Sequence, residues 1–231
     1  MTSYTLIGTP FSTFTRTISL GLHYKAIPFI QEATLPHSDL AKINHPFGFI
    51  PTLIIKTGAD NDLGDEIKLR ESQAIARYLD RIKPEPSLQL NEQEVEGGGL
   101  AVPEKMWEFV SFVASFGFNA VEVGVVKPRL KAMDDGVEES EIRKVIAPGV
   151  ETLRSFLSVA ESLFTSHKKF AFASRPTWAD FFLYPLLSDL SAIPEWDEVA
   201  SQKVKQWKQD MDGLEAVKNT MGGTLEAGSR P

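Results

Sequence analysis

Three hydroxyl side chains stand where a predicted strand gives way to a predicted helix, and they are well placed for chemistry. They are Ser12, Thr13 and Thr15, shortly after the apolar run that ends at Ile7. The positive end of a helix dipole favours negative charge, so a hydroxyl near a helix start can help to stabilise an anion. A helix cap without chemistry is the plain alternative, because serine is also a common N-cap residue.

The sequence does not support a serine nucleophile. Such a serine needs a nearby general base, and none of the histidines stands in a motif that would supply one. The chain has no cysteine, which excludes disulfides, thiolate metal ligands, CxxC redox chemistry and cysteine nucleophiles. We therefore expect any serine chemistry to be non-covalent. The histidines are His23, His37, His45 and His167.

Composition narrows the class of protein. The chain has 231 residues, of which 42% are hydrophobic, enough for one large or two modest globular domains. A formal net charge of -7 argues against a nucleic-acid partner, because such binding depends on lysine and arginine. The start lacks a basic signal region, and no run approaches the length of apolar residues that a membrane helix needs. We expect a cytoplasmic protein that binds no membrane.

The N-terminal part has the pattern of a small α/β domain. Short apolar strands alternate with amphipathic helices, giving a βαβ unit, a connecting helix, and then two antiparallel strands and a helix. Ser38 is the expected cap of the connecting helix. The expected strands are 4–7, 27–30, 52–56 and 66–70, and the expected helices are 13–25, 38–44 and 72–82.

The rest of the chain is predicted to be helical. A polar, glycine-rich linker at 85–102 separates residues 1–84 from a helical domain at 103–231. Thr177 and Asp180 have the spacing of a capping box at the start of a very apolar helix. We expect prolines to end, bend or kink three of the helices. The expected helices run from 106 to about Pro128, from 138 to 163 with Pro148 inside, from 178 to 190 with Pro185 inside, and from 203 to 220.

Four segments, in this order, resemble the soluble glutathione transferase family. The resemblance spans both predicted domains, and the order and spacing of the first three would be improbable by chance. It implies a thioredoxin-like α/β N-terminal domain followed by an all-α helical bundle. The segments are Thr9-Pro10-Phe11-Ser12-Thr13-Phe14-Thr15-Arg16, Pro46-Phe47-Gly48-Phe49-Ile50-Pro51, Glu71-Ser72-Gln73-Ala74-Ile75-Ala76-Arg77-Tyr78-Leu79 and Thr177-Trp178-Ala179-Asp180.

The resemblance implies a binding site for glutathione. Pro51 would take the cis form, turning the backbone of Ile50 outward to pair with the cysteinyl part of the tripeptide. Glu71 and Ser72 would bind the γ-glutamyl end. Ser72, as the cap of its helix, would help to hold the α-carboxylate, and Glu71 would contact the ammonium. The alternatives are a trans proline at a strand start, an ordinary cap and a solvated glutamate.

The resemblance assigns catalysis to Ser12. This residue lies four positions before Arg16, a spacing that resembles the serine-type classes of the family. Its hydroxyl would donate a hydrogen bond to the glutathione sulfur and favour the thiolate. A free thiol has a pKa of about 8.5, so a fall of about two units, each about 1.36 kcal/mol, ionises it at neutral pH. One charge-assisted hydrogen bond and a helix dipole have that strength. Thr13 and Thr15 stay open as rivals.

Other positions match the family loosely. Phe49 stands where many serine-type members have a polar residue, which we expect to weaken glutathione binding. His37 lies near a position that binds the glycyl carboxylate in some classes, although a surface histidine is an equal alternative. The loop at 57–65 is longer than is usual, and we assign it no role. Between the domains we expect an apolar pocket for the second substrate, with Phe11, Phe112 and Phe116 as candidate walls unless these rings only fill the core.

The resemblance implies an enzyme that transfers the glutathione thiolate to apolar electrophiles, as in detoxification. Glutathione is then a co-substrate, no metal is needed, and a homodimer is expected. Two alternatives stay open. One is a glutathione- or ligand-binding homologue with little catalysis, and the other is a glutathione-dependent peroxidase or isomerase.

Overall fold

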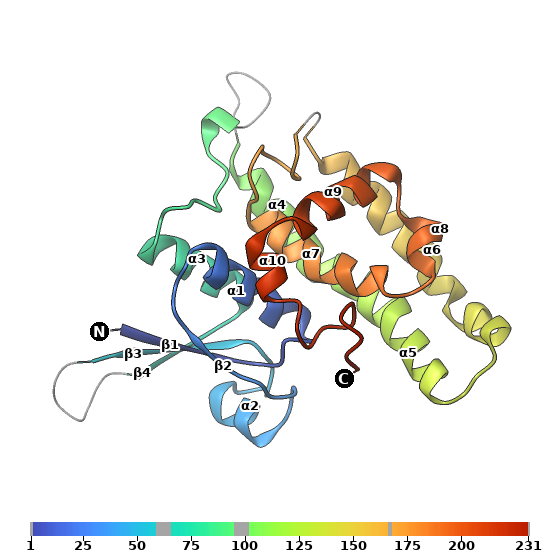
Figure 1. Ribbon diagram of the computed structural model, residues 1–231, viewed down its shortest axis with the longest axis horizontal. Helices are drawn as coiled ribbons and strands as arrows, with labels where there is room; N and C mark the ends of the chain where they lie inside the picture. Colours follow the sequence, from blue (N-terminus) through green and yellow to red (C-terminus); the bar gives the residue numbers. More distant parts are fainter. Residues whose placement is uncertain (1, 59–65, 95–101, 166–167, 231) are drawn as a thin grey trace. The chain divides into compact units, whose positions relative to one another are not determined.

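The computed structural model describes residues 2–58, 66–94, 102–165 and 168–230 (Figure 1). Its contacts divide the chain into two compact units, Met1–Leu88 with Leu214–Pro231, and Gln89–Gly213. Three features of the sequence analysis fall partly or wholly outside the described residues: the centre of the predicted linker, most of the 57–65 loop, and His167. The domain boundaries drawn from the sequence stay a prediction.

The first unit is built on a four-stranded mixed sheet with the order β2-β1-β3-β4. β1 pairs in parallel with β2 and antiparallel with β3, and β3 pairs antiparallel with β4. This is the βαβ unit and hairpin expected from the sequence, in a thioredoxin-like arrangement. The elements are β1 Thr2–Ile7, α1 Thr13–Tyr24, β2 Ile30–Glu32, α2 Asp39–Asn44, β3 Thr52–Thr57, β4 Glu66–Arg70, α3 Ser72–Ile82 and α10 Glu215–Asn219.

Apolar side chains of the sheet and of two helices form the core of this unit. α1 and α3 pack against each other, and Figure 1 shows them side by side. The fully buried apolar residues come from the inward faces of the strands and of α3, and from all sides of α1, where residues 15–22 are all buried. They include Leu6, Leu53, Ile18, Leu20, Leu22, Ile75 and Leu79.

The second strand was predicted three residues too early. The backbone N–H of Ile27 donates to the carbonyl of Leu22, so this residue still belongs to the turn that ends α1. Pro28 has no N–H to give to a strand neighbour. β2 therefore begins only at Ile30.

The second unit is helical. α7 lies at its centre, with every residue from Trp178 to Leu190 buried. Nine helical elements make up the part of this unit that the structure describes. They are η1 Glu92–Glu94, α4 Glu104–Phe112, η2 Val113–Gly117, η3 Asn119–Val126, α5 Lys127–Asp134, α6 Glu139–Leu163, α7 Trp178–Ser191, α8 Glu195–Val199 and α9 Gln202–Asp212, with Gly213 closing α9.

Prolines do not end the helices that contain Pro128, Pro148 and Pro185, while the bends or kinks expected at them stay a prediction. The chain stays helical through Pro128, and η3 before it has π geometry, with the N–H of Lys127 donating to the carbonyl of Glu122. Pro128 stands in the first turn of α5, where a missing N–H costs little. α6 likewise continues through Pro148. The last predicted helix is in fact two, α9 and α10, separated at Gly213.

The helical stretch Glu104–Asp134 has 31 residues and a mean hydropathy of 1.7 in its most apolar window, so by length and composition alone it could cross a membrane. Half of that window is buried inside the structure. A core helix of a soluble protein passes the same test, so this is weak evidence for a membrane span.

The capping box predicted at α7 is confirmed. The carboxylate of Asp180 accepts hydrogen bonds from the backbone N–H of Thr177 at 2.7 Å and from its hydroxyl at 2.8 Å. It also accepts from the N–H of Ala171 and from the indole of Trp207. Burial raises the pKa of Asp180, and these donors oppose the rise.

Candidate glutathione site

The register of the sheet places four strand ends in one row. Ile7, the last residue of β1, pairs with Glu32, the last residue of β2, and with Thr52, the first residue of β3. Thr52 pairs in turn with Arg70, the last residue of β4. Adjacent strands are about 4.8 Å apart, so the row is only about 15 Å wide. The segments that leave or enter the sheet there therefore emerge at a single edge.

Three of the predicted site segments lie at this edge. Ser12 follows the end of β1, Ile50 and Pro51 directly precede β3, and Glu71 and Ser72 directly follow β4. Sequence positions that are up to sixty residues apart are thus brought together by strand pairing.

Ser12 is the N-cap of α1. Its backbone has extended geometry, and its Oγ accepts from the N–H of Thr15 at 3.5 Å, a long and weak capping bond. Its side chain is half-buried. The first turn of α1 contains no acidic residue, so the positive end of the helix dipole is not neutralised locally. A hydroxyl so weakly engaged is available to donate to an anion.

The two rival hydroxyls are less accessible. Thr15 is 0% exposed and Thr13 is 5% exposed. The Oγ1 of Thr15 faces Gly8 and has no hydrogen-bond partner among the described residues. A ligand that reached either side chain would have to displace packed backbone.

The Ile50–Pro51 peptide bond is cis, as the resemblance implies. Ile50 is half-buried and Pro51 is buried. Within the part of the chain that the structure describes, no backbone group pairs with the N–H or the carbonyl of Ile50. Both groups are therefore open to an external peptide.

Glu71, not Ser72, holds the cap position of α3, which corrects the expectation for Ser72. The carbonyl of Glu71 accepts from the N–H of Ile75, and Ser72 is the first helical residue. Among the residues that the structure describes, no side chain caps this helix. Glu71 has φ 64° and ψ 113°, a conformation that costs a residue with a side chain about 1–3 kcal/mol. Strain of this size often accompanies a functional position.

Contacts from α2 hold the end of β4. Arg70 Nε donates to the carbonyl of Asn44 at 2.7 Å. The Nε2 of His45 lies 3.7 Å from a carboxylate oxygen of Glu71, whose side chain is exposed. His45 was set aside in the sequence analysis. Because its relation to Glu71 is formed only by tertiary packing, no local motif could have indicated it.

His37 and Phe49 lie on the segments that follow β2 and precede β3. The N–H of His37 donates to the carbonyl of Gly48 at 2.7 Å, and the His37 ring lies 3.1 Å from the carbonyl oxygen of Phe47. The His37 and Phe49 rings meet edge to face at 5.2 Å, and Phe49 is 54% exposed. His37 is therefore oriented by its neighbours but stays open to solvent.

The candidate walls of a second-substrate pocket are divided between the two units. Phe11 belongs to the first unit and is half-buried. Phe116 belongs to the second, where it is 65% exposed and lies 5.6 Å from Phe112. Phe112 in turn stacks on Phe156 at 5.2 Å. Phe116 is thus a surface aromatic next to the half-buried ring of Phe112.

Among the described residues, no three histidine, aspartate or glutamate side chains lie together as metal ligands would. The polar groups at the edge of the sheet where the four strand ends lie are of the kind that bind a peptide with charged ends.

Comparisons with known proteins support the fold described above. The family model of the Glutathione S-transferase, N-terminal domain matches residues 6–87, and that of the Glutathione S-transferase, C-terminal domain matches residues 138–216. Together they cover more than half of the chain. The chain belongs to the glutathione S-transferase family.

Solved structures share the fold at low identity. Glutathione transferase F7 from Populus trichocarpa is similar with a TM-score of 0.69 and 22% identity over 94% of this chain and 97% of that one. FzlA from C. crescentus has a TM-score of 0.72 and 19% identity over 95% and 92% of the two chains. Maleylacetoacetate isomerase from Anaeromyxobacter dehalogenans 2CP-1 has a TM-score of 0.60 and 18% identity over 95% and 94%. No curated protein matches the sequence.

Proposed function

We propose that this protein is a glutathione transferase of the serine type, which conjugates the glutathione thiolate to apolar electrophiles. The observation that supports the proposal most is the row of strand ends. It brings the weakly capped Ser12, the open backbone of Ile50 and the start of α3 to one edge of the sheet.

Each part of the tripeptide has a complementary group at this edge. The backbone of Ile50 would pair with the cysteinyl residue, and the uncapped start of α3 at Ser72 would bind the γ-glutamyl carboxylate. The exposed carboxylate of Glu71 would take the ammonium, and His37 the glycyl carboxylate. Ser12 would then donate to the sulfur. Binding the thiolate in preference to the thiol lowers the pKa of the thiol, which is the catalytic effect.

The Ser12→Ala variant tests the proposal with an aryl-halide acceptor. If the hydroxyl accounts for a shift of about two pKa units, the rate at pH 7 falls by about 25-fold, and the loss shrinks as the pH rises past 8.5. Ser201→Ala is the matched control, because Ser201 is also an N-cap whose side chain accepts a backbone N–H, at 3.2 Å. An unchanged pH profile in Ser12→Ala would remove Ser12 from the mechanism.

A binding protein with little catalysis is the second candidate, and Phe49 favours it. An exposed phenyl ring stands where a polar contact to glutathione would strengthen binding. Isothermal titration with glutathione, alongside the conjugation assay, separates the two. Binding without turnover of any acceptor would favour the binding protein. A glutathione peroxidase or isomerase assay on the same sample covers the remaining alternative.

We extend the proposal to the assembly and the second substrate. The aromatic rings of Phe11 and Phe116 would contact the electrophile, and the protein would be a cytoplasmic homodimer. The exposed apolar side chains Ile43 and Phe47 support a dimer, because a contact with a second copy would remove them from water. A single-chain mass by light scattering would contradict it.

A further inference from the structure

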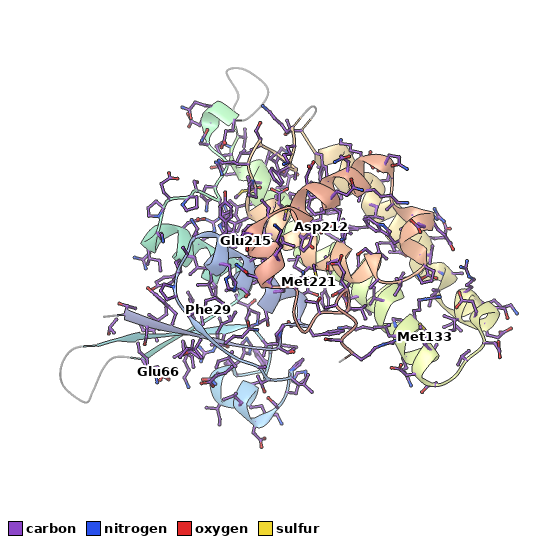
Figure 2. All side chains as sticks on the ribbon, viewed as in Figure 1. Phe29, Glu66, Met133, Asp212, Glu215 and Met221 are labelled. Atoms are coloured by element: carbon purple, nitrogen blue, oxygen red, sulfur yellow. The ribbon has the colours of Figure 1, made fainter. Side chains whose placement is uncertain are left out.

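The end of the chain packs on the helix that begins at Ser12. Residues Leu214–Pro231 belong to the first unit, and α10 packs against α1. Beyond α10 the chain turns through Met221, which Figure 2 labels. The guanidinium of Arg16 donates to the sulfur of Met221 at 3.9 Å. Arg16 is only 3% exposed, so this contact is made inside the unit.

A second contact joins the end of the chain to the loop that precedes Ser12. Gly223 has φ 78°, and a Cβ placed on it would lie 3.3 Å from Cβ and 3.4 Å from Cγ of Pro10. The turn is closed internally, since the hydroxyl of Thr224 donates to the carbonyl of Met221 at 2.7 Å. We call residues 221–224 the C-terminal brace. It touches the chain two residues before and four residues after Ser12.

A cavity of about 140 Å³ lies beside these two contacts of the brace. Its lining comes from α1 and β2 on one side and from the chain end on the other. The lining residues are Ser19, His23, Gln31, Asn219, Thr220 and Gly222, with Pro10 and Arg16 at the brace. Because a cavity replaces packed contacts, the two contacts of the brace matter more for the position of the chain around Ser12.

We propose that the C-terminal brace is a positioning element for Ser12, which holds Pro10 and Arg16 so that the hydroxyl points at the bound sulfur. This inference rests on the proposed function of Ser12. Hydrogen-bond strength falls steeply with distance and angle, and a displacement of about 1 Å at a reacting group is enough to slow catalysis severely. A displaced brace therefore raises the pKa of the bound thiol.

Two glycines allow a matched test. Gly223 and Gly228 both have positive φ, 78° and 82°, so alanine is strained at either position. A Cβ on Gly228 meets no described atom within 4 Å, whereas one on Gly223 presses on Pro10. The pKa of the bound thiol is read from the ultraviolet absorbance of the thiolate as a function of pH. We expect Gly223→Ala to raise this pKa by about half a unit or more and to lower kcat several-fold, with KM for glutathione changed less. Gly228→Ala should match the wild type.

A measurement without glutathione separates this inference from the proposed function. Hydrogen exchange of the peptide that spans residues 8–16 should be faster in Gly223→Ala than in Gly228→Ala or the wild type. If Gly223→Ala does not fold, Met221→Leu replaces it as the test, because leucine keeps the volume of methionine but removes the sulfur acceptor. Met221→Leu should raise the hydrogen-exchange rate and the thiol pKa as Gly223→Ala does, by smaller amounts. Equal behaviour of the brace variants and Gly228→Ala would overturn the inference. A wild-type protein that ionises no bound thiol would overturn the proposed function, and the exchange pattern would still decide the role of the brace.

Discussion

Lys25 of α1 and Asp80 of α3 form a buried ion pair, with Nζ and Oδ1 2.7 Å apart. The same ammonium donates to the carbonyls of Lys83 and Pro86, each at 2.9 Å. Lys25 is completely buried. The pair joins the far ends of the two helices whose starts carry Ser12 and Ser72, so it fixes how those starts are spaced.

Lys25→Met should therefore destabilise the fold strongly. It leaves the carboxylate of Asp80 buried without its counter-charge, which costs about 3–5 kcal/mol in the free energy of unfolding. Urea denaturation measures the loss. Lys105→Met is the control, because Lys105 forms an exposed pair with Glu108 and should change stability by less than about 1 kcal/mol. Similar losses in both variants would show that burial of the pair does not matter.

Thr15→Val should leave conjugation unchanged. The Thr15 hydroxyl is fully buried and has no hydrogen-bond partner in the described part of the chain, so its replacement by a methyl group removes an unsatisfied polar atom. We expect a gain of about 1 kcal/mol in stability. Steady-state kinetics and thermal melting check the two parts. A loss of activity comparable to that of Ser12→Ala would instead make Thr15 the functional hydroxyl.

Glu71→Gly should make the fold more stable but weaken the binding of glutathione. Glycine adopts positive φ without the steric cost that the glutamate bears, and part of this gain is offset by the greater freedom of glycine in the unfolded chain. We expect a net gain of up to about 1 kcal/mol in thermal unfolding. Glutathione affinity, measured by titration, should fall, because the contact to the ammonium is lost. A variant that is more stable and binds equally well would exclude Glu71 from the site.

Glu122 should make the stability of the protein depend on pH. Glu122 is buried in η3, and this burial raises its pKa to about 6, against the smaller opposing effects of Lys127 and Asp189. The folded state therefore binds a proton that the unfolded state has already released. Its stability is highest below the unfolded pKa near 4.5 and falls as the pH rises through about 6, by on the order of 1–2 kcal/mol.

The Glu122→Gln variant should abolish that fall. Urea denaturation at a series of pH values between 4 and 8 gives the dependence, with Glu104→Gln at an exposed position as control. A wild-type slope in Glu122→Gln would mean that another group is responsible.

Much of the first unit was predictable because its signals are local. β4 and α3 have the predicted bounds, since strand alternation and helical periodicity are properties of short windows. The caps at Ser38 and Thr177 were predictable for the same reason. β2 was misplaced because a hydrogen bond from Ile27 to the end of α1 competes with strand formation.

The remaining features depend on contacts between residues that are far apart in the sequence, and no short sequence window contains both partners. The row through Ile7, Thr52 and Arg70 follows from strand register, which is set by three strands together. Glu71 departs from the local rule that a serine would cap α3, and such departures concentrate at functional sites. The packing of the chain end on α1 is equally tertiary, because nothing in the local sequence of Gly223 points to Pro10.

The pairing of Lys56 with Glu66 lies at the opposite edge of the sheet from the row that carries Ser12, Ile50 and Glu71. A fluorescent reporter or an affinity tag inserted where the chain passes from β3 to β4 should therefore leave turnover intact. That connection offers a handle for immobilising the protein or for building a sensor with the row of strand ends facing outward.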